Sequence, residues 1–365
     1  MKKAIAGKTA AGAAEVAQNA IQERFKDGLG VNPLTIVVLQ VHRDVNLNGD
    51  PDAGNRPRET ASGVRYATPA SFKRKLRNVF AEAGLPQFYT SGTYLDMAHR
   101  AAAEHAGIEP GSPGADSVTA SQAIVRALCE RHLDARLFGL VVGNESVTGC
   151  VQFLNTIDLA GCPTEFNTIT RSSSVLKKTD AASKAVKQKG TAAEIAQAAQ
   201  RAKRGDLQTM GTRWFIPFSV TLTVGEYDPR WGLRNGVTSQ DLDVLFEAMT
   251  IAAEHNRTAS RPDSRTLAVL MFEHCNTFAP SAGGIYARLG RPVAGPRTFE
   301  PTGGVFELRV RDGLEYATRL EDMTLQLRLD RMPQGLRLVR HYGLENLELV
   351  TPDGSVEADL TEMKR

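Results

Sequence analysis

The sequence has no long apolar run and few cysteines. No stretch of the 365 residues approaches the ~18 consecutive apolar residues of a membrane-spanning helix, so we expect no membrane partner. The N-terminal segment lacks the apolar core of a secretory signal, and the four cysteines show no C-x-x-C pairing. We therefore expect buried, reduced thiols in a cytoplasmic protein rather than disulfides or a zinc site. The cysteines are Cys129, Cys150, Cys162 and Cys275.

The signatures of common enzymes are also missing. The chain has no P-loop, no His-Glu-x-x-His zinc motif, no Gly-x-Ser-x-Gly turn and no Rossmann glycine fingerprint. We therefore expect a protein that is not an enzyme, with no catalytic residue, no metal and no cofactor. The formal net charge of +3 is too small to indicate nucleic-acid binding by itself, so the distribution of charge matters more.

Positive charge is concentrated in residues 168–213. Ten cations there stand against three acids, a net +7, and because the whole chain is only +3 the remainder nets −4. The segment has few large apolar residues, so it cannot build a core of its own. Such an arm is a common RNA-ordering element, and a solubilising loop is the alternative. The cations are Arg171, Lys177, Lys178, Lys184, Lys187, Lys189, Arg201, Lys203, Arg204 and Arg213.

Residues 44–58 are dominated by Asn, Gly, Asp and Pro, which is the composition of tight turns. Arg56 and Arg58 lie beside exposed amides and suit a phosphate or a base edge. The start of the segment also matches a calcium loop, but Asn55 occupies the twelfth position, where that loop needs glutamate. A self-bonded turn cluster, an RNA-binding loop and a calcium loop therefore all remain open.

Residues 68–84 are expected to form a basic helix. Thr68 suits the N-cap, Pro69 the first turn, and Gly84 the end of the helix. An apolar stripe runs along one side, and four cations follow within five residues. Phosphate contact and a solvated helix face are the two interpretations of these cations, and the family resemblance given below favours phosphate contact. The cations are Lys73, Arg74, Lys75 and Arg77.

The order of expected elements indicates an α+β fold. Strands are expected over 34–41, 147–159, 214–227 and 266–272, with a second helix after the capping box at 238–241. Helical patches are expected over 94–106 and 117–134, and further strands over 306–310 and 325–329. Strand, helix, strand, strand, helix, strand is the ferredoxin-like order. There is no aromatic run typical of RRM sheets, and Phe138 and Phe153 are expected in the core.

These blocks resemble the backbone subunit of type I CRISPR surveillance complexes (Cascade), family seven of the CRISPR-associated proteins, and most closely that of subtype I-C. The first match, N-x-N-G-D-P-D-A-G-N-x-P-R followed by K-R-K-L-R-N, is long and specific. Leu47, where relatives tend to have proline, suggests a divergent variant. Matching blocks continue at 137–139, 151–153, 168–171, 209–211, 255–261 and 272–274.

The resemblance implies an RRM/ferredoxin-like palm with inserted helical fingers and a basic thumb. The palm would take 32–84, 136–167 and 213–300, the fingers 85–135 and the thumb 168–212. Residues 1–31 lie outside the resemblance and are expected to be a helical or disordered extension, with a tag remnant or docking helix also open. Residues 301–365 would add a β-rich part and an acidic tail.

The function implied is an antiviral one: identical subunits oligomerise head to tail along a CRISPR guide RNA and present it to target DNA. Other Cascade subunits and a helicase-nuclease would be partners. Two alternatives are a type III-like ribonuclease using Asp44, Asp50 or Asp52, and a calcium-organised module without RNA. The expected RNA-binding residues are Asn55, Arg56, Arg58, Lys73, Arg74, Lys75, Arg77, Arg171, Lys177, Lys178, Lys187, Met210 and Arg213.

Overall fold

A computed structural model gives the structure of the chain. It describes residues 29–90, 94–109, 118–143, 145–171, 191, 208–274, 306–311, 313–331, 336–350 and 356–357. In this part of the chain, no helix is long and apolar enough to cross a membrane.

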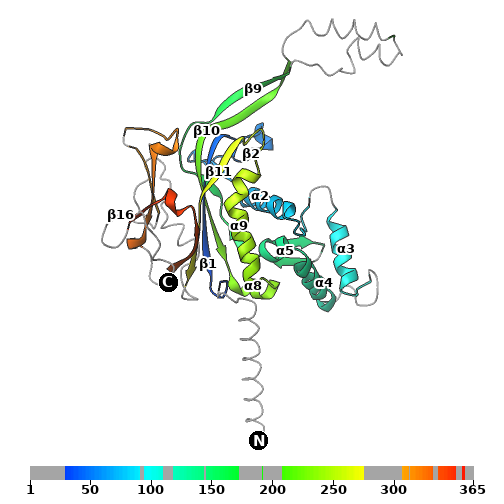
Figure 1. Ribbon diagram of the computed structural model, residues 1–365. Coiled ribbons are helices and arrows are strands. Elements are labelled where there is room, and N and C mark those ends of the chain that lie inside the picture. The colour runs from blue at the N-terminus through cyan, green and yellow to red at the C-terminus, as the bar shows by residue number, and fades with distance from the viewer. Residues whose placement is uncertain are drawn as a thin grey trace.

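The centre of the molecule is an eight-stranded antiparallel sheet (Figure 1). Its strands follow the order β14-β11-β1-β10-β8-β4, and β7 and β9 also pair with β10. The four expected strand regions all contribute to it, although the region 147–159 divides into β7 and β8, which join this sheet, and part of β6 (Glu145–Thr148), which does not. The strands are β1 Leu34–Val45, β4 Tyr66–Ala67, β7 Val151–Phe153, β8 Thr156–Asp158, β9 Glu165–Arg171, β10 Gln208–Tyr227, β11 Asp263–His274 and β14 Leu336–Tyr342.

Two helices cover one face of the sheet, α2 (Pro69–Glu82) and α9 (Ser239–His255). They pack on the apolar residues of β1 that point to this side, Leu34, Ile36 and Val38. Both helices begin as expected, because Thr68 and Thr238 accept hydrogen bonds from backbone N–H groups of the first turn. A short helix, α8 (Pro229–Asn235), precedes α9.

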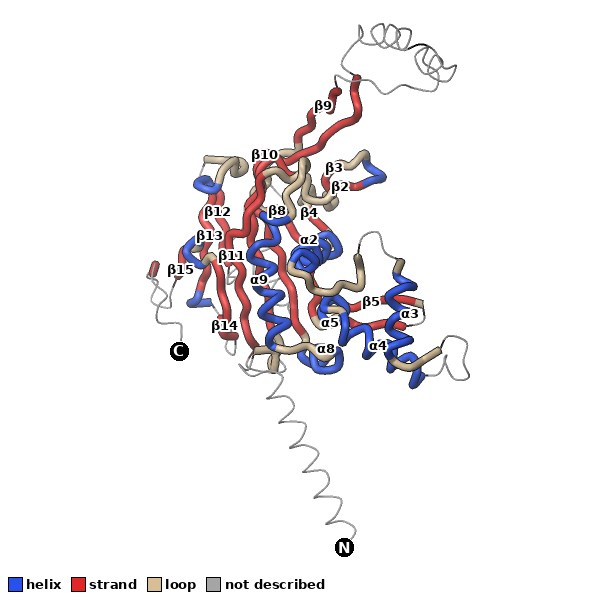
Figure 2. Tube along the Cα trace, turned by 45° about the vertical axis from the view of Figure 1, so that its right-hand side comes forward, coloured by secondary structure: helices blue, strands red, loops and turns tan. Residues whose placement is uncertain are grey.

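A second, smaller sheet covers the opposite face (Figure 2). The alternate β1 residues Val37 and Leu39 pack there against Leu325 and Leu327, so β1 is buried on both faces as its apolar run predicts. This sheet consists of β12 Phe306–Val310, β13 Met323–Arg328, β15 Glu348–Val350 and β16 Val356–Glu357, with 3₁₀ turns η2 Leu320–Asp322, η3 Leu329–Arg331 and η4 Leu344–Asn346.

A helical unit inserted after α2 packs around its own small core. It comprises α3 (Leu95–His105), α4 (Val118–Arg131), α5 (Leu133–Phe138) and the hairpin β5 (Gly139–Val142) with β6 (Glu145–Thr148). The two expected helical patches are confirmed. Because the hairpin packs with α3 and α4 and does not join the large sheet, the expected boundary at residue 136 falls inside this unit.

Candidate nucleic-acid interface

The loop at 44–58 is a small hairpin held together by its own side chains. Strands β2 (Gly49–Asp50) and β3 (Arg56–Pro57) flank a 3₁₀ turn, η1 (Pro51–Ala53). The Asn46 amide donates to the Asn55 carbonyl over 2.7 Å. Asn55 has φ +64°, and a Cβ on Gly49 would overlap its side chain. The turn-cluster interpretation is therefore confirmed as the architecture of this loop.

Two polar side chains of this loop, Asp50 and Asn48, already have hydrogen-bond partners. The Asp50 carboxylate accepts from Arg58 over 2.9 Å, and Asn48 Oδ1 accepts from both the backbone and the hydroxyl of Thr68 at 3.0 Å. Among the described residues, no group of three or more His, Cys, Asp or Glu side chains could hold a metal. Asn48 therefore fixes the start of α2, and the calcium interpretation of the loop stays an untested alternative.

An arginine and two aromatic rings form a surface beside this loop. The Arg56 guanidinium lies 5.5 Å from the centre of the Trp214 ring, and Trp214 lies 5.2 Å from Phe166. Phe166 is 61% exposed. The rings face each other because Phe166 of β9 and Trp214 of β10 are register partners. Our sequence analysis did not identify them, although an aromatic residue on each strand flanking the basic segment was a usable signal.

The four cations of α2 have different environments. Arg74 is exposed. Lys73 donates to Gln152 over 2.8 Å, and burial, reinforced by Arg77, lowers the pKa of Lys73 to about 8. Arg77 pairs with the fully buried Asp134 over 2.8 Å, which ties α2 to the helical insertion. Only Arg74 among these four therefore lies openly on the surface.

Lys75 lies on the inner side of α2, where it is only 7% exposed. Burial first, and then the charge of Arg261, lower the pKa of Lys75 to about 7. His42 of β1 is also buried, and its ring nitrogens contact Ser264 at 2.8 Å and Thr221 at 3.1 Å. Burial, followed by the charges of Lys75 and Arg261, holds the pKa of His42 well below its usual value. This imidazole is therefore neutral at pH 7.

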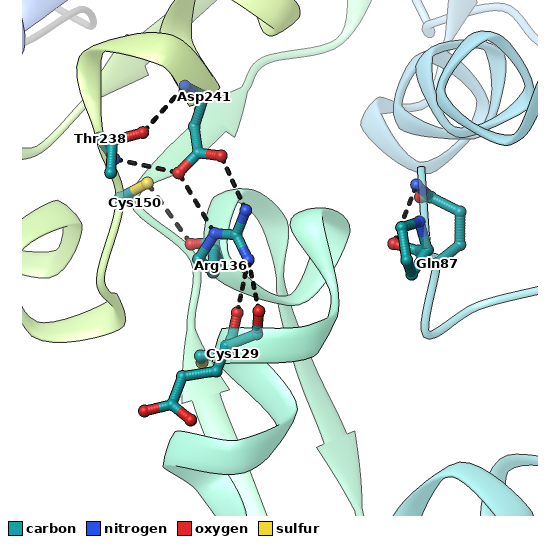
Figure 3. A network of polar contacts seen from close by, with 8 residues as sticks. Gln87, Cys129, Arg136, Cys150, Thr238 and Asp241 are labelled. Carbon is teal, nitrogen blue, oxygen red and sulfur yellow. Dashed lines mark hydrogen bonds and ion pairs between the residues drawn. The ribbon is translucent and has the colours of Figure 1, made fainter. Parts of the chain in front are cut away.

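A separate network around Arg136 fixes the insertion to α9 (Figure 3). Arg136 donates to Asp241 over 2.7 Å and to the Cys129 carbonyl over 2.8 Å, while Asp241 also accepts from the Thr238 N–H. Cys150 donates from its thiol to the Arg136 carbonyl. Burial raises the pKa of the Cys129 thiol to about 11. Cys129, Cys150 and Cys162 are buried and free as expected, and Cys275 lies outside the described residues.

The remaining expected site residues belong to the basic segment. Arg213 donates to the Asp44 carbonyl over 2.9 Å, so it contacts the 44–58 loop directly. Arg171 and Met210 lie on the strands β9 and β10, whose ribbon extends beyond the sheet (Figure 1). Lys177, Lys178 and Lys187 lie outside the described residues.

Comparisons with known proteins point to one family. The family model described as CRISPR-associated protein Cas7 matches residues 32–283, which include the loop, α2 and the β9–β10 ribbon. No curated protein matches the chain. A chain of a "CRISPR RNA-guided surveillance complex, pre-nicking" is 15% identical, with 66% of this chain and 78% of that chain covered at TM-score 0.40. A chain of a second "CRISPR RNA-guided surveillance complex" is 13% identical, with 68% and 79% covered at TM-score 0.34.

Proposed function

Because this chain belongs to the CRISPR-associated protein Cas7 family, we propose that it is the guide-RNA-binding backbone subunit of a type I surveillance complex, similar to subtype I-C. Strand order β11-β1-β10-β8 with α2 and α9 on one face supports an RRM/ferredoxin-like palm. The helical insertion would be the fingers, and the β9–β10 ribbon the base of the thumb.

The observation that carries this proposal is a set of arginine donors without acceptors. The Nε atoms of Arg58, Arg213 and Arg261 are buried, and none has a hydrogen-bond partner among the described residues. All three adjoin the 44–58 loop: Arg58 belongs to it, Arg213 contacts Asp44, and Ser260, next to Arg261, accepts from the Asn46 N–H. Buried donors that lack acceptors cost free energy, and phosphate oxygens are strong acceptors for guanidinium groups.

The aromatic surface formed by Arg56, Trp214 and Phe166 supports the same conclusion. Proteins that bind single-stranded nucleic acid without sequence preference use exposed aromatic rings beside cations, because every base has a face that can stack on a ring. The binding would therefore combine phosphate contacts at the loop with stacking at the foot of the ribbon. The edges of the guide bases would stay free to pair with target DNA.

We further propose that identical copies assemble head to tail along the guide. Head-to-tail contacts that do not close generate a filament, whose length the RNA would then limit. The ribbon carries Phe166 and Ile169, which are 61% and 44% exposed, on a segment that extends from the palm. Other Cascade subunits and a helicase-nuclease would be further partners. The chain itself would bind without cutting. Asp50, one of the three acids of the ribonuclease alternative, already accepts from Arg58 and from the N–H of Asp52.

The proposal is tested by replacing Arg56 and Arg213 together with alanine. The matched control replaces Arg126 of α4 and Arg230 of α8, two exposed cations away from the loop. Full-length proteins would be produced with a guide RNA and the amount of co-purified RNA measured. We expect the Arg56/Arg213 variant to lose most of its RNA and the control to keep it. Equal RNA in both folded variants, or an RNA-free parent protein, would contradict the proposal.

A further inference from the structure

Three consecutive side chains at the end of α9 contact other elements of the fold. Glu254 accepts from the backbone N–H of Thr266 in β11 at 3.0 Å. The His255 ring lies 3.0 Å from the carboxylate of Glu82, at the end of α2. The third residue, Asn256, bonds to the middle of α2. The end of α9 is therefore joined to the large sheet once and to α2 twice.

Asn256 is only 8% exposed, and both polar atoms of its amide have partners. Nδ2 donates to the carbonyl of Ala252 at 2.8 Å, which closes the end of α9, and to the carbonyl of Lys75 in α2 at 3.0 Å. Oδ1 accepts from the side chain of Asn78 in α2 at 2.6 Å. Because carbonyl oxygens can only accept, this orientation of the amide follows from its partners. Alanine at this position would make none of the three bonds.

The chain that follows Asn256 leads directly to the 44–58 loop. A tight turn at 258–261 is closed by two backbone hydrogen bonds, of 2.8 and 3.1 Å. The Ser260 carbonyl in this turn accepts from the N–H of Asn46 in the loop at 2.9 Å. The position of Asn256 therefore sets where this part of the loop is held.

The same loop is also held by α2. Asn48 of the loop accepts from the N–H and the hydroxyl of Thr68 at 3.0 Å, and Thr68 is the N-cap of α2. The loop thus contacts α2, α2 contacts Asn256, and the turn after Asn256 contacts the loop. Without the Asn256 side chain, the turn at 258–261 loses its hydrogen bonds to α2, and the loop loses one of the two fixed positions that hold it.

We propose that Asn256 is a positioning residue for RNA binding: it contacts no RNA, and it holds the 44–58 loop and α2 in the binding arrangement before RNA arrives. This inference rests on the proposed function and adds a residue that acts through others. The apparent affinity of a site falls in proportion to the fraction of the protein that holds the binding arrangement. Loss of the Asn256 amide should therefore weaken RNA binding without removing a contact to a phosphate.

The test compares full-length Asn256→Ala with the parent and with a matched control, Asn235→Ala. Asn235 is also buried, and its amide donates to two carbonyls, at 3.0 and 2.8 Å, at the end of α8 and away from the loop. Binding of a fluorescent single-stranded RNA is measured by anisotropy across a salt series, and unfolding in urea is followed by circular dichroism. We expect both variants to unfold at a lower urea concentration than the parent, because each loses buried hydrogen bonds.

RNA binding should distinguish the two variants. Asn256→Ala should bind RNA about tenfold more weakly than the parent, the effect of a binding arrangement held roughly a tenth of the time, and Asn235→Ala should bind like the parent. The salt slope of Asn256→Ala should equal that of the parent, whereas loss of a phosphate contact would reduce it by about 0.7. In the RNA-free protein, backbone N–H groups of the 44–58 loop should exchange with deuterium faster in Asn256→Ala than in the control, because the turn that holds Asn46 is released.

The outcomes separate this inference from the proposed function. If the parent binds RNA and Asn256→Ala loses no more affinity than Asn235→Ala, Asn256 has only a structural role, and the proposed function stands. A reduced salt slope for Asn256→Ala would make it a contact residue and would also overturn the inference. If the parent binds no RNA, both fail. Should Asn256→Ala not fold, Asn78→Ala, which removes only the 2.6 Å bond, decides: weaker binding at an unchanged slope is expected, and parent-like binding overturns the inference.

Discussion

Replacing Lys75 with methionine should stabilise the RNA-free protein, and the gain should shrink as the pH rises. Methionine has a similar length and no charge, so the substitution removes the cost of a buried ammonium while keeping the apolar part of the side chain. The usual result for a buried residue is destabilisation. An increase in stability would therefore be a specific consequence of the unpaired charge.

The magnitude follows from the titration of the two states. Burial and then Arg261 lower the pKa of Lys75 from 10.5 to about 7 on folding. Between these values the unfolded chain holds a proton that the folded protein does not, so the stability of the parent rises with pH. With about 1.4 kcal/mol for each pKa unit, the penalty is on the order of 4 kcal/mol at pH 7 and about 2 kcal/mol at pH 9. The benefit of methionine should follow the same trend.

Urea unfolding of both proteins at pH 7, 8 and 9, followed by circular dichroism, measures this difference directly. The control is Arg126→Met, an exposed cation in α4, for which a change within about 0.5 kcal/mol at every pH is expected. A Lys75→Met protein that is less stable than the parent at pH 7, or whose advantage does not change between pH 7 and 9, would refute the reasoning. It would mean that the ammonium reaches water or an acceptor in solution.

Two further substitutions test the fold and the interface. Arg77→Ala leaves the buried Asp134 without its counter-charge, held only by the backbone N–H groups of Phe88 and Tyr89. We therefore expect a loss of about 3 kcal/mol in the free energy of unfolding, measured in urea, with Arg126→Ala as control. A loss below about 1 kcal/mol would show that the pair does not hold α2 to the insertion. Phe166→Ala removes an exposed ring, so stability should be unchanged while RNA binding by anisotropy weakens by about 1–3 kcal/mol. Unchanged RNA affinity would exclude Phe166 from the stacking surface.

Local patterns predicted much of this fold because they depend on near neighbours in the chain. The apolar run at 34–41 became a strand buried on both faces, and the caps at Thr68 and Thr238 start α2 and α9. The loop at 44–58 is a hairpin held by its own hydrogen bonds, as the turn-cluster interpretation predicted. Each of these outcomes depends on hydrophobic period, helix capping or turn chemistry, and all three are determined by residues within one short segment.

The roles of the α2 cations were harder to predict from the sequence. Lys75 falls three residues after Phe72 and four before Val79, so its place on the buried face was readable from the helical period. What was not readable was the partner: Asp134 reaches Arg77 across 57 positions, and no acid in the described part of the chain reaches Lys75. Similarly, Phe166 and Trp214 meet only because β9 and β10 pair in one register.

By itself, the sequence determined where strands, helices and turns form, because these follow from the hydrophobic period and from residue chemistry along the chain. It also predicted that Cys129, Cys150 and Cys162 are buried and free. Only the tertiary structure decided which cations are neutralised and which are left without a counter-charge. The charge balance of a buried group is set by side chains that approach from distant segments. Among the described residues that difference separates Arg77, which is paired with Asp134, from Lys75, on which no carboxylate acts.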